Sequence, residues 1–171
     1  DDSAEGKKMR EFLNSVTDLT DKITLEEVKL SRTPSFTIDR KDFVSGITFA
    51  GLPMGHEFPS FILAMVQVSG RAPKVSEEVV EKIKSITTPM NFETYVSLTC
   101  HNCPDVVQGL NIMSVLNPNI THTMVEGGAN KAEVERLNIM AVPTVYLNGE
   151  EFSSGRATIE DLLGKVTTKV E

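Results

Sequence analysis

The feature that most constrains the fold is the segment Cys100-His-Asn-Cys103, which holds both cysteines of the 171-residue chain. Residues 92–98 before it have the composition of a β-strand, and residues 104–116 after it have the apolar spacing of a helix. Backbone N–H groups at a helix N-terminus stabilise a thiolate. The pattern therefore predicts a redox-active dithiol on an α/β scaffold, with Cys100 as the exposed nucleophile and Cys103 as the resolving thiol.

A zinc site and a structural disulfide account for the cysteine pair less well. A zinc site needs two further ligands, and the remaining candidates are His56, His101 and His122, with no second cysteine pair. A purely structural disulfide across two residues closes too small a ring to constrain the unfolded chain. His101 lies between the cysteines, where it either tunes thiol acidity or is an exposed filler residue. His122, flanked by threonines, is expected at the surface.

The remaining chain alternates predicted strands and helices in two halves. Residues 87–89 (Thr-Thr-Pro) interrupt the pattern, which predicts one small α/β unit over 1–89 and a second over 90–171. The expected helices are 3–17, 56–68, 76–86, 104–116, 129–136 and 158–166, and the expected strands are 22–30, 33–39, 47–50, 92–98, 120–126, 144–147 and 151–153.

The two halves share a short internal match. Residues 33–39 (TPSFTID) align with residues 142–148 (VPTVYLN), with Pro34 and Pro143 in equivalent places. Two copies of one fold are therefore expected. The first half has no strand before its first helix, so we expect the chain to be a fragment that lacks at least one N-terminal strand. A first sheet completed by residues 1–90 alone would contradict this expectation.

The prolines differ in what they face. In folds that use a Cys-X-X-Cys pair at a helix start, a cis-proline loop faces the disulfide, and its backbone can pair with an incoming peptide. Pro143 is expected to take this role. No cysteine exists to face Pro34, so the first half is expected to be redox-silent.

Composition removes several classes of function. The chain has 24 acidic and 17 basic residues, a formal net charge of −7 and no cluster of Lys and Arg, which argues against nucleic-acid binding. No apolar run approaches the roughly 20 residues needed to span a bilayer. With so few cysteines and no export signal, the chain is expected in the cytoplasm.

Several segments resemble one family. Residues 92–108 (FETYVSLTCHNCPDVVQ), 112–118, 149–156 (GEEFSSGR) and 49–58 (FAGLPMGHEF) closely resemble the N-terminal domain of the flavoprotein subunit of alkyl hydroperoxide reductase. The resemblance covers essentially the whole chain. It implies two tandem thioredoxin/glutaredoxin-like folds, the first lacking its N-terminal strand in this chain and only the second carrying a dithiol.

The resemblance also implies an electron path. In that family NADH reduces FAD in a covalently linked thioredoxin-reductase-like region, which reduces the Cys-X-X-Cys pair, which in turn reduces a two-cysteine peroxiredoxin. By this match Cys100 attacks the peroxiredoxin disulfide, Cys103 resolves the intermediate, and Glu57 approaches the disulfide from the first half. From the residues alone, Glu57 simply complements a helix dipole.

The chain itself has no G-x-G-x-x-G after a strand, so FAD and NADH are expected in the missing reductase region and no cofactor or metal in this chain. Two other functions remain open. One is a free-standing glutaredoxin-like disulfide oxidoreductase. The other is a non-catalytic docking module with incidental thiols.

Overall fold

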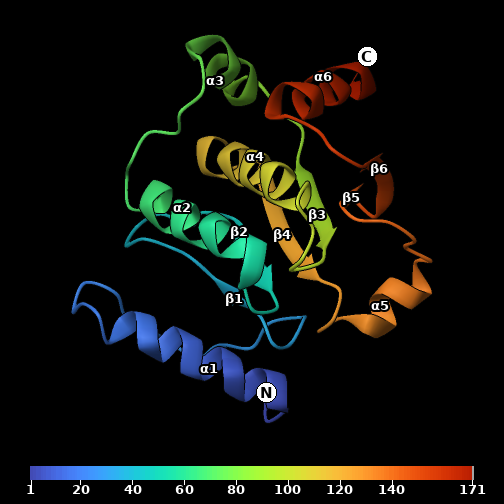
Figure 1. Ribbon diagram of the computed structural model, residues 1–171. Helices are drawn as coiled ribbons and strands as arrows, with labels where there is room; N and C mark the ends of the chain where they lie inside the picture. The colour runs from blue at the N-terminus through green and yellow to red at the C-terminus, as the bar shows by residue number, and fades with distance from the viewer. Residues whose placement is uncertain (171) are drawn as a thin grey trace.

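The computed structural model describes residues 1–170, which build one six-stranded mixed sheet with helices packed on it (Figure 1). The strand order is β1-β2-β4-β3-β5-β6. The strands are β1 (Phe36–Thr37), β2 (Ile47–Ala50), β3 (Met90–Val96), β4 (Ile120–Glu126), β5 (Thr144–Leu147) and β6 (Glu150–Ser154). The helices are α1 (Ala4–Thr17), η1 (Gly55–Glu57, a 3-10 turn), α2 (Phe58–Val68), α3 (Glu77–Lys84), α4 (Cys103–Leu116), α5 (Lys131–Arg136) and α6 (Ile159–Val170).

The sheet runs through both halves of the chain. β2 of the first half pairs in parallel with β4 of the second, with Ile47 opposite His122 and Ala50 opposite Val125. β3 pairs in parallel with β4, whereas β1 with β2, β3 with β5, and β5 with β6 pair antiparallel. The predicted division at residue 89 stays a prediction, and the backbone hydrogen bonds of the sheet join the parts on either side of it.

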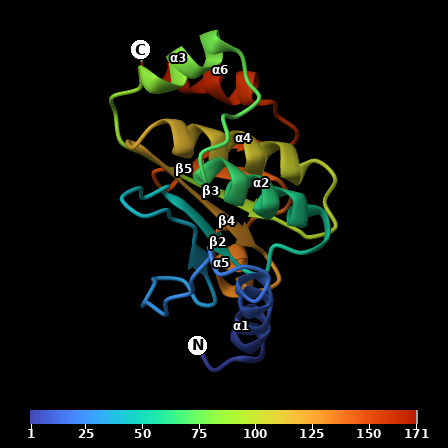
Figure 2. The same cartoon turned by 90° about the vertical axis from the view of Figure 1, so that its left-hand side faces the viewer.

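The second half has the β-α-β order followed by a hairpin and a helix that the sequence predicts. Helices α2 and α4 lie side by side on one face of the sheet. Helices α3 and α6 pack against each other and against α4, on the side of α4 away from α2 (Figures 1 and 2). Because α4 is covered by the sheet, α2 and α6, its Val106, Leu110 and Met113 are fully buried. This burial fixes the helix that carries the cysteine pair.

Local sequence explains where the helices begin. The Ser3 side chain accepts a hydrogen bond from the Gly6 N–H at 3.0 Å, and Ser76 caps α3 by accepting from the Val79 N–H at 3.2 Å. In α4 the second residue is Pro104, whose missing N–H costs nothing in a first helical turn. Predicted and observed helices agree to within a few residues.

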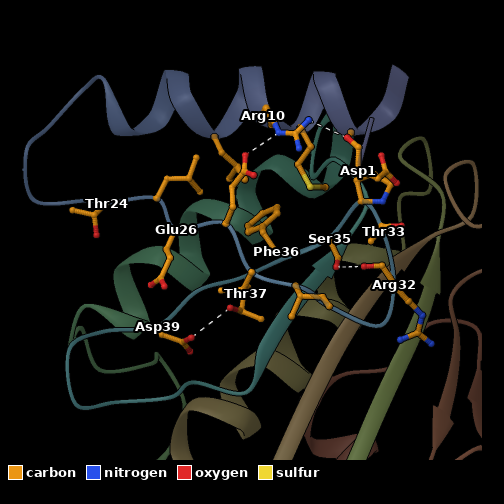
Figure 3. Close-up of a pocket in the computed structure, with 18 residues that line it drawn as sticks. Asp1, Arg10, Thr24, Glu26, Arg32, Thr33, Ser35, Phe36, Thr37 and Asp39 are labelled. Carbon is orange, nitrogen blue, oxygen red and sulfur yellow. Dashed lines mark hydrogen bonds and ion pairs between the residues drawn. The ribbon is translucent and has the colours of Figure 1, made fainter. Parts of the chain in front are cut away.

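The strand predicted at residues 22–30 is wrong. This segment has no regular structure, and Leu25 and Val28 are 41% and 62% exposed. An alternating pattern makes a strand only where a neighbouring strand offers backbone partners, and no strand within residues 1–170 pairs with this segment. It runs beside β1 instead, where it and α1 line an open pocket of about 400 Å³ (Figure 3).

Among the described residues, the first half contributes only β1 and β2 to the sheet, so a complete first sheet within residues 1–90 is not found. A strand absent from the chain stays a prediction. Over the part of the chain that the structure describes, none of the helices combines the length and the apolar character that crossing a bilayer requires.

Candidate redox site

The two cysteines are joined at the start of α4. Cys100 and Cys103 form a disulfide with their Cα atoms 5.6 Å apart. Cys103 is the first residue of the helix and is fully buried, whereas Cys100 lies in the preceding turn and is half-buried. One sulfur is therefore open to a partner and the other is shielded, with the positive end of the helix dipole beside both.

A proline loop faces the exposed sulfur. The Val142–Pro143 peptide bond is cis, and the carbonyl oxygen of Val142 lies 3.8 Å from Cys100 Sγ. Val142 is 37% exposed, so this residue of the loop lies at the protein surface beside the disulfide. The structure thus brings Pro143 and the cysteine pair together.

Glu57 is fully buried at the start of α2. Neither of its carboxylate oxygens has a hydrogen-bond partner of normal geometry. Burial raises the pKa of Glu57 to about 7, and the nearby Ser60 hydroxyl offsets part of that rise. Because η1 and α2 pack against α4, this acid lies in the same interface as the helix start that carries Cys103.

His101 meets a histidine from the first half. The rings of His56 and His101 pack edge to face with their centroids 4.4 Å apart and an interplanar angle of 64°. The backbone N–H of His56 donates to the Leu98 carbonyl at 2.9 Å, which joins η1 to the loop before Cys100. The sequence singles out His56 only as a possible metal ligand, although the Gly-His-Glu-Phe segment that contains it is among those that resemble the family.

His122 is not at the surface, as predicted from its threonine neighbours, but is fully buried. On a central strand the two flanking threonines face one side of the sheet while His122 faces α4. Its Nδ1 lies 2.7 Å from Asn111 Oδ1, which can only accept, so Nδ1 carries the proton and Nε2 accepts from the Thr94 hydroxyl at 2.7 Å. Burial lowers the pKa of His122 to about 3, and the ring is neutral.

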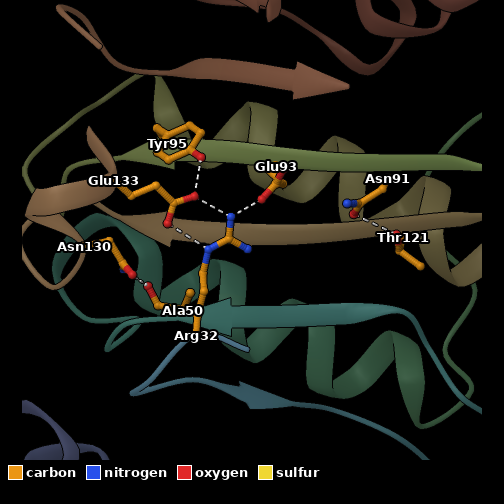
Figure 4. A network of polar contacts seen from close by, with 8 residues as sticks. All are labelled: Arg32, Ala50, Asn91, Glu93, Tyr95, Thr121, Asn130 and Glu133. Carbon is orange, nitrogen blue, oxygen red and sulfur yellow. Dashed lines mark hydrogen bonds and ion pairs between the residues drawn. The ribbon is translucent and has the colours of Figure 1, made fainter. Parts of the chain in front are cut away.

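A polar network joins the halves on the opposite face of the sheet (Figure 4). Arg32, in the loop before Pro34, makes ion pairs with Glu93 on β3 and with Glu133 on α5, where Arg32 Nε is 3.0 Å from Glu133 Oε2. The Tyr95 hydroxyl donates to Glu133 at 2.6 Å. The Arg32 guanidinium lowers the pKa of Glu133. Across residues 1–170, no cluster of three or more His, Cys, Asp or Glu residues is arranged to hold a metal ion.

Comparison with known proteins agrees with this geometry. Residues 90–168 match the family model described as a thioredoxin domain. The chain is 52% identical over 162 residues to the AhpF component of Staphylococcus aureus alkyl hydroperoxide reductase, covering 95% of this chain and 32% of that protein. The crystal structure of the N-terminal domain of alkylhydroperoxide reductase AhpF from Enterococcus faecalis superposes with a TM-score of 0.87 at 27% identity, covering 95% of this chain and 84% of that one.

The chain is homologous to the N-terminal domain of AhpF. It spans about a third of the curated relatives it matches, which include a protein named NADH dehydrogenase from Bacillus subtilis, 58% identical over 160 residues, covering 94% of this chain and 31% of that protein. The family resemblance seen in the sequence and the thioredoxin-like α/β fold are confirmed. A protein disulfide oxidoreductase from Aeropyrum pernix, with a TM-score of 0.70 at 22% identity, shares the fold, covering 83% of this chain and 62% of that one.

Homology to AhpF, the thioredoxin-like fold and the Cys100–Cys103 disulfide make the chain a domain of the disulfide-oxidoreductase class, as the sequence predicts.

Proposed function

We propose that this chain is a dithiol–disulfide electron shuttle. It takes two electrons from an FAD- and NADH-dependent reductase region and passes them to a two-cysteine peroxiredoxin, in a system that removes peroxides in the cytoplasm. The observation that carries the proposal is the asymmetric cysteine pair, with half-buried Cys100 facing the Val142 carbonyl and Cys103 fully buried. The names of the relatives support the reductase and peroxide parts of the proposal.

The transfer to the partner proceeds in two exchanges. The Cys100 thiolate attacks one sulfur of the peroxiredoxin disulfide, forming a mixed disulfide and releasing the other partner sulfur as a thiolate, which takes up a proton. Cys103, losing its proton, then attacks Cys100 Sγ. The Cys100–Cys103 disulfide forms, and the second partner sulfur leaves as a thiolate and is protonated. Two electrons and two protons have moved to the partner.

In the proposal two side chains and one loop assist these exchanges. Glu57, whose pKa of about 7 lets it exchange a proton near neutral pH, accepts the proton of buried Cys103 as that thiol attacks and passes it to the departing partner thiolate. His101 stabilises the Cys100 thiolate. The loop at Pro143 offers backbone groups to the cysteine-bearing segment of the partner.

In the proposal, residues outside this chain reduce the Cys100–Cys103 disulfide again. The relatives are about three times as long as the matched region, which leaves room for a linked reductase that binds FAD and NADH. By this proposal the chain alone does not oxidise NADH.

The test mixes the reduced chain rapidly with an oxidised two-cysteine peroxiredoxin, with glutathione disulfide as a competing oxidant. We expect electron transfer to the peroxiredoxin to be much faster and to be abolished in Cys100→Ser. A preference for glutathione disulfide would replace the proposal with a glutaredoxin-like function. Activity that survives in Cys100→Ser would leave a docking module with incidental thiols.

A further inference from the structure

The contact between His56 and His101 gives the cysteine-free half of the chain a part in the chemistry. We propose that His56 is a positioning residue, which holds the His101 ring beside Cys100 so that the imidazole stabilises the Cys100 thiolate. This inference rests on the proposed function, in which Cys100 is the nucleophile, and adds a residue that acts through another residue.

His56 is placed by its backbone. Its N–H donates to the Leu98 carbonyl at 2.9 Å, two residues before Cys100. The preceding Gly55 has φ +55°, and a Cβ there would lie 2.6 Å from the same carbonyl oxygen. Only glycine permits this close approach of η1 to the loop, and the approach brings the His56 ring to the ring of His101.

The ring contact is not explained by burial, because both histidines are exposed. An exposed histidine normally exchanges between rotamers and spends little time in any one place. With its centroid 4.4 Å from that of His56, the His101 ring has a packed neighbour in a favourable edge-to-face geometry. An imidazole held in one place beside a sulfur stabilises the thiolate more than a mobile one, since a donor must be near the charge to act on it.

Other ionisable groups lie on the same elements and set the background for this effect. Glu57 follows His56 and is buried, and Asp105 lies in the first turn of α4 and is exposed. Both acids oppose a thiolate when ionised. Helix α2 and residues 139–143 have no ionisable side chain, and no Lys or Arg occurs in η1, in α4 or in the loop that joins β3 to α4. His56 and His101 are therefore the basic side chains of these elements.

The experiment measures the reactivity of the Cys100 thiol alone. In a Cys103→Ser background Cys100 is the single thiol of the chain, and its rate of alkylation by iodoacetamide between pH 5 and pH 9 reports the thiolate fraction. We expect His101→Ala to slow alkylation at pH 6.5 by about three- to tenfold and to shift the profile to higher pH. His56→Ala is expected to reproduce at least half of that shift, and the double variant to be no slower than His101→Ala.

Two matched variants define the outcome. His56→Phe keeps a ring against His101 and is expected to restore most of the wild-type profile, whereas Met54→Ala, in the same loop, is expected to change nothing. An unchanged profile in His56→Ala, additive losses in the double variant, or no rescue by His56→Phe would overturn the inference. Failure of the proposed function is separate, because it appears as slow transfer from the wild-type dithiol to the peroxiredoxin.

Discussion

The loop before Pro143 and the loop before Pro34 have the same backbone form, each with a cis peptide bond and each leading into a strand of one sheet. Their surroundings differ. The first faces the Cys100 sulfur through the Val142 carbonyl, whereas the second carries Arg32, which reaches across to Glu93 and Glu133. One loop is placed at a reactive group, and the other ties the halves together.

The two proline loops differ in what faces them, and only the loop at Pro143 lies beside the disulfide. The first half has such a loop but no cysteine. It still contributes to the site, because Glu57 and His56 lie at the start of its helix α2, against α4. Variants in each half therefore measure the contribution of that half to reactivity or to stability.

The largest effect is expected from Cys103→Ser, which leaves the nucleophile and removes the resolving thiol. The reduced variant should remain covalently bound to an oxidised two-cysteine peroxiredoxin, since nothing attacks Cys100 Sγ from within. Mass spectrometry without reductant measures the adduct. The double variant with Cys100→Ser is the control and should form none. No adduct with the single variant Cys103→Ser would mean that Cys100, beside the second proline loop, is not the attacking thiol.

The next largest effect is expected from removing the ion pairs of Arg32 at the first proline loop. Arg32→Ala leaves Glu93 and Glu133 close together without their shared cation, and we expect a loss of about 1 to 3 kcal/mol in the free energy of unfolding. Chemical denaturation measures it. Arg10→Ala is the control: it breaks the exposed pair with Glu27 and should cost at most about 0.5 kcal/mol. Equal losses would show that the network adds nothing beyond a surface ion pair.

Glu57→Gln tests the acid that the first half supplies. In the unfolded chain Glu57 ionises near its ordinary pKa of 4.5, whereas in the fold its pKa is about 7, so wild-type stability falls as pH rises between these values. The uncharged glutamine avoids this loss, and the variant should gain on the order of 2 kcal/mol over wild type at pH 8 and little at pH 4. Glu78→Gln, at an exposed position, should show no such trend in the same denaturation series.

His122 makes the opposite pH contribution in the second half. Its pKa is about 3 in the fold and about 6.5 when unfolded, so below pH 6.5 the unfolded chain binds the extra proton and stability falls with falling pH. We expect His122 to contribute up to about 1.4 kcal/mol per pH unit between pH 6 and pH 4. The slope should disappear in His122→Gln and persist in Asn111→Ala, because burial and not the hydrogen bond lowers the pKa. A slope retained in His122→Gln would assign it to other groups.

Much of the second half could be predicted from the sequence because its signals are local. The junction of strand, cysteine pair and helix follows from neighbouring residues, as does the capped helix α3 of the first half. Local signals failed where tertiary partners decide. Residues 22–30 alternate like a strand but have no neighbouring strand within residues 1–170 to pair with, and His122 is buried because β4 is a central strand.

The contacts between the two halves could not be predicted from the sequence either, because they too depend on tertiary partners. The pairing of β2 with β4, the ring contact of His56 with His101, and the ion pairs of Arg32 join residues far apart in the chain. Each of these contacts depends on how the two halves of the chain pack against one another. The internal match predicts two copies of one fold, and it contains no information on which sheet edges meet.

The parallel pairing of β2 with β4 has a mechanical consequence. Four residue pairs in register join the two halves through the backbone of one sheet. In the proposed function Cys100 meets an electron donor and then an acceptor, and bending between the halves would break the hydrogen bonds that join β2 to β4. The proposed function therefore requires the two halves to move together as one body, with Cys100 at a fixed place on it.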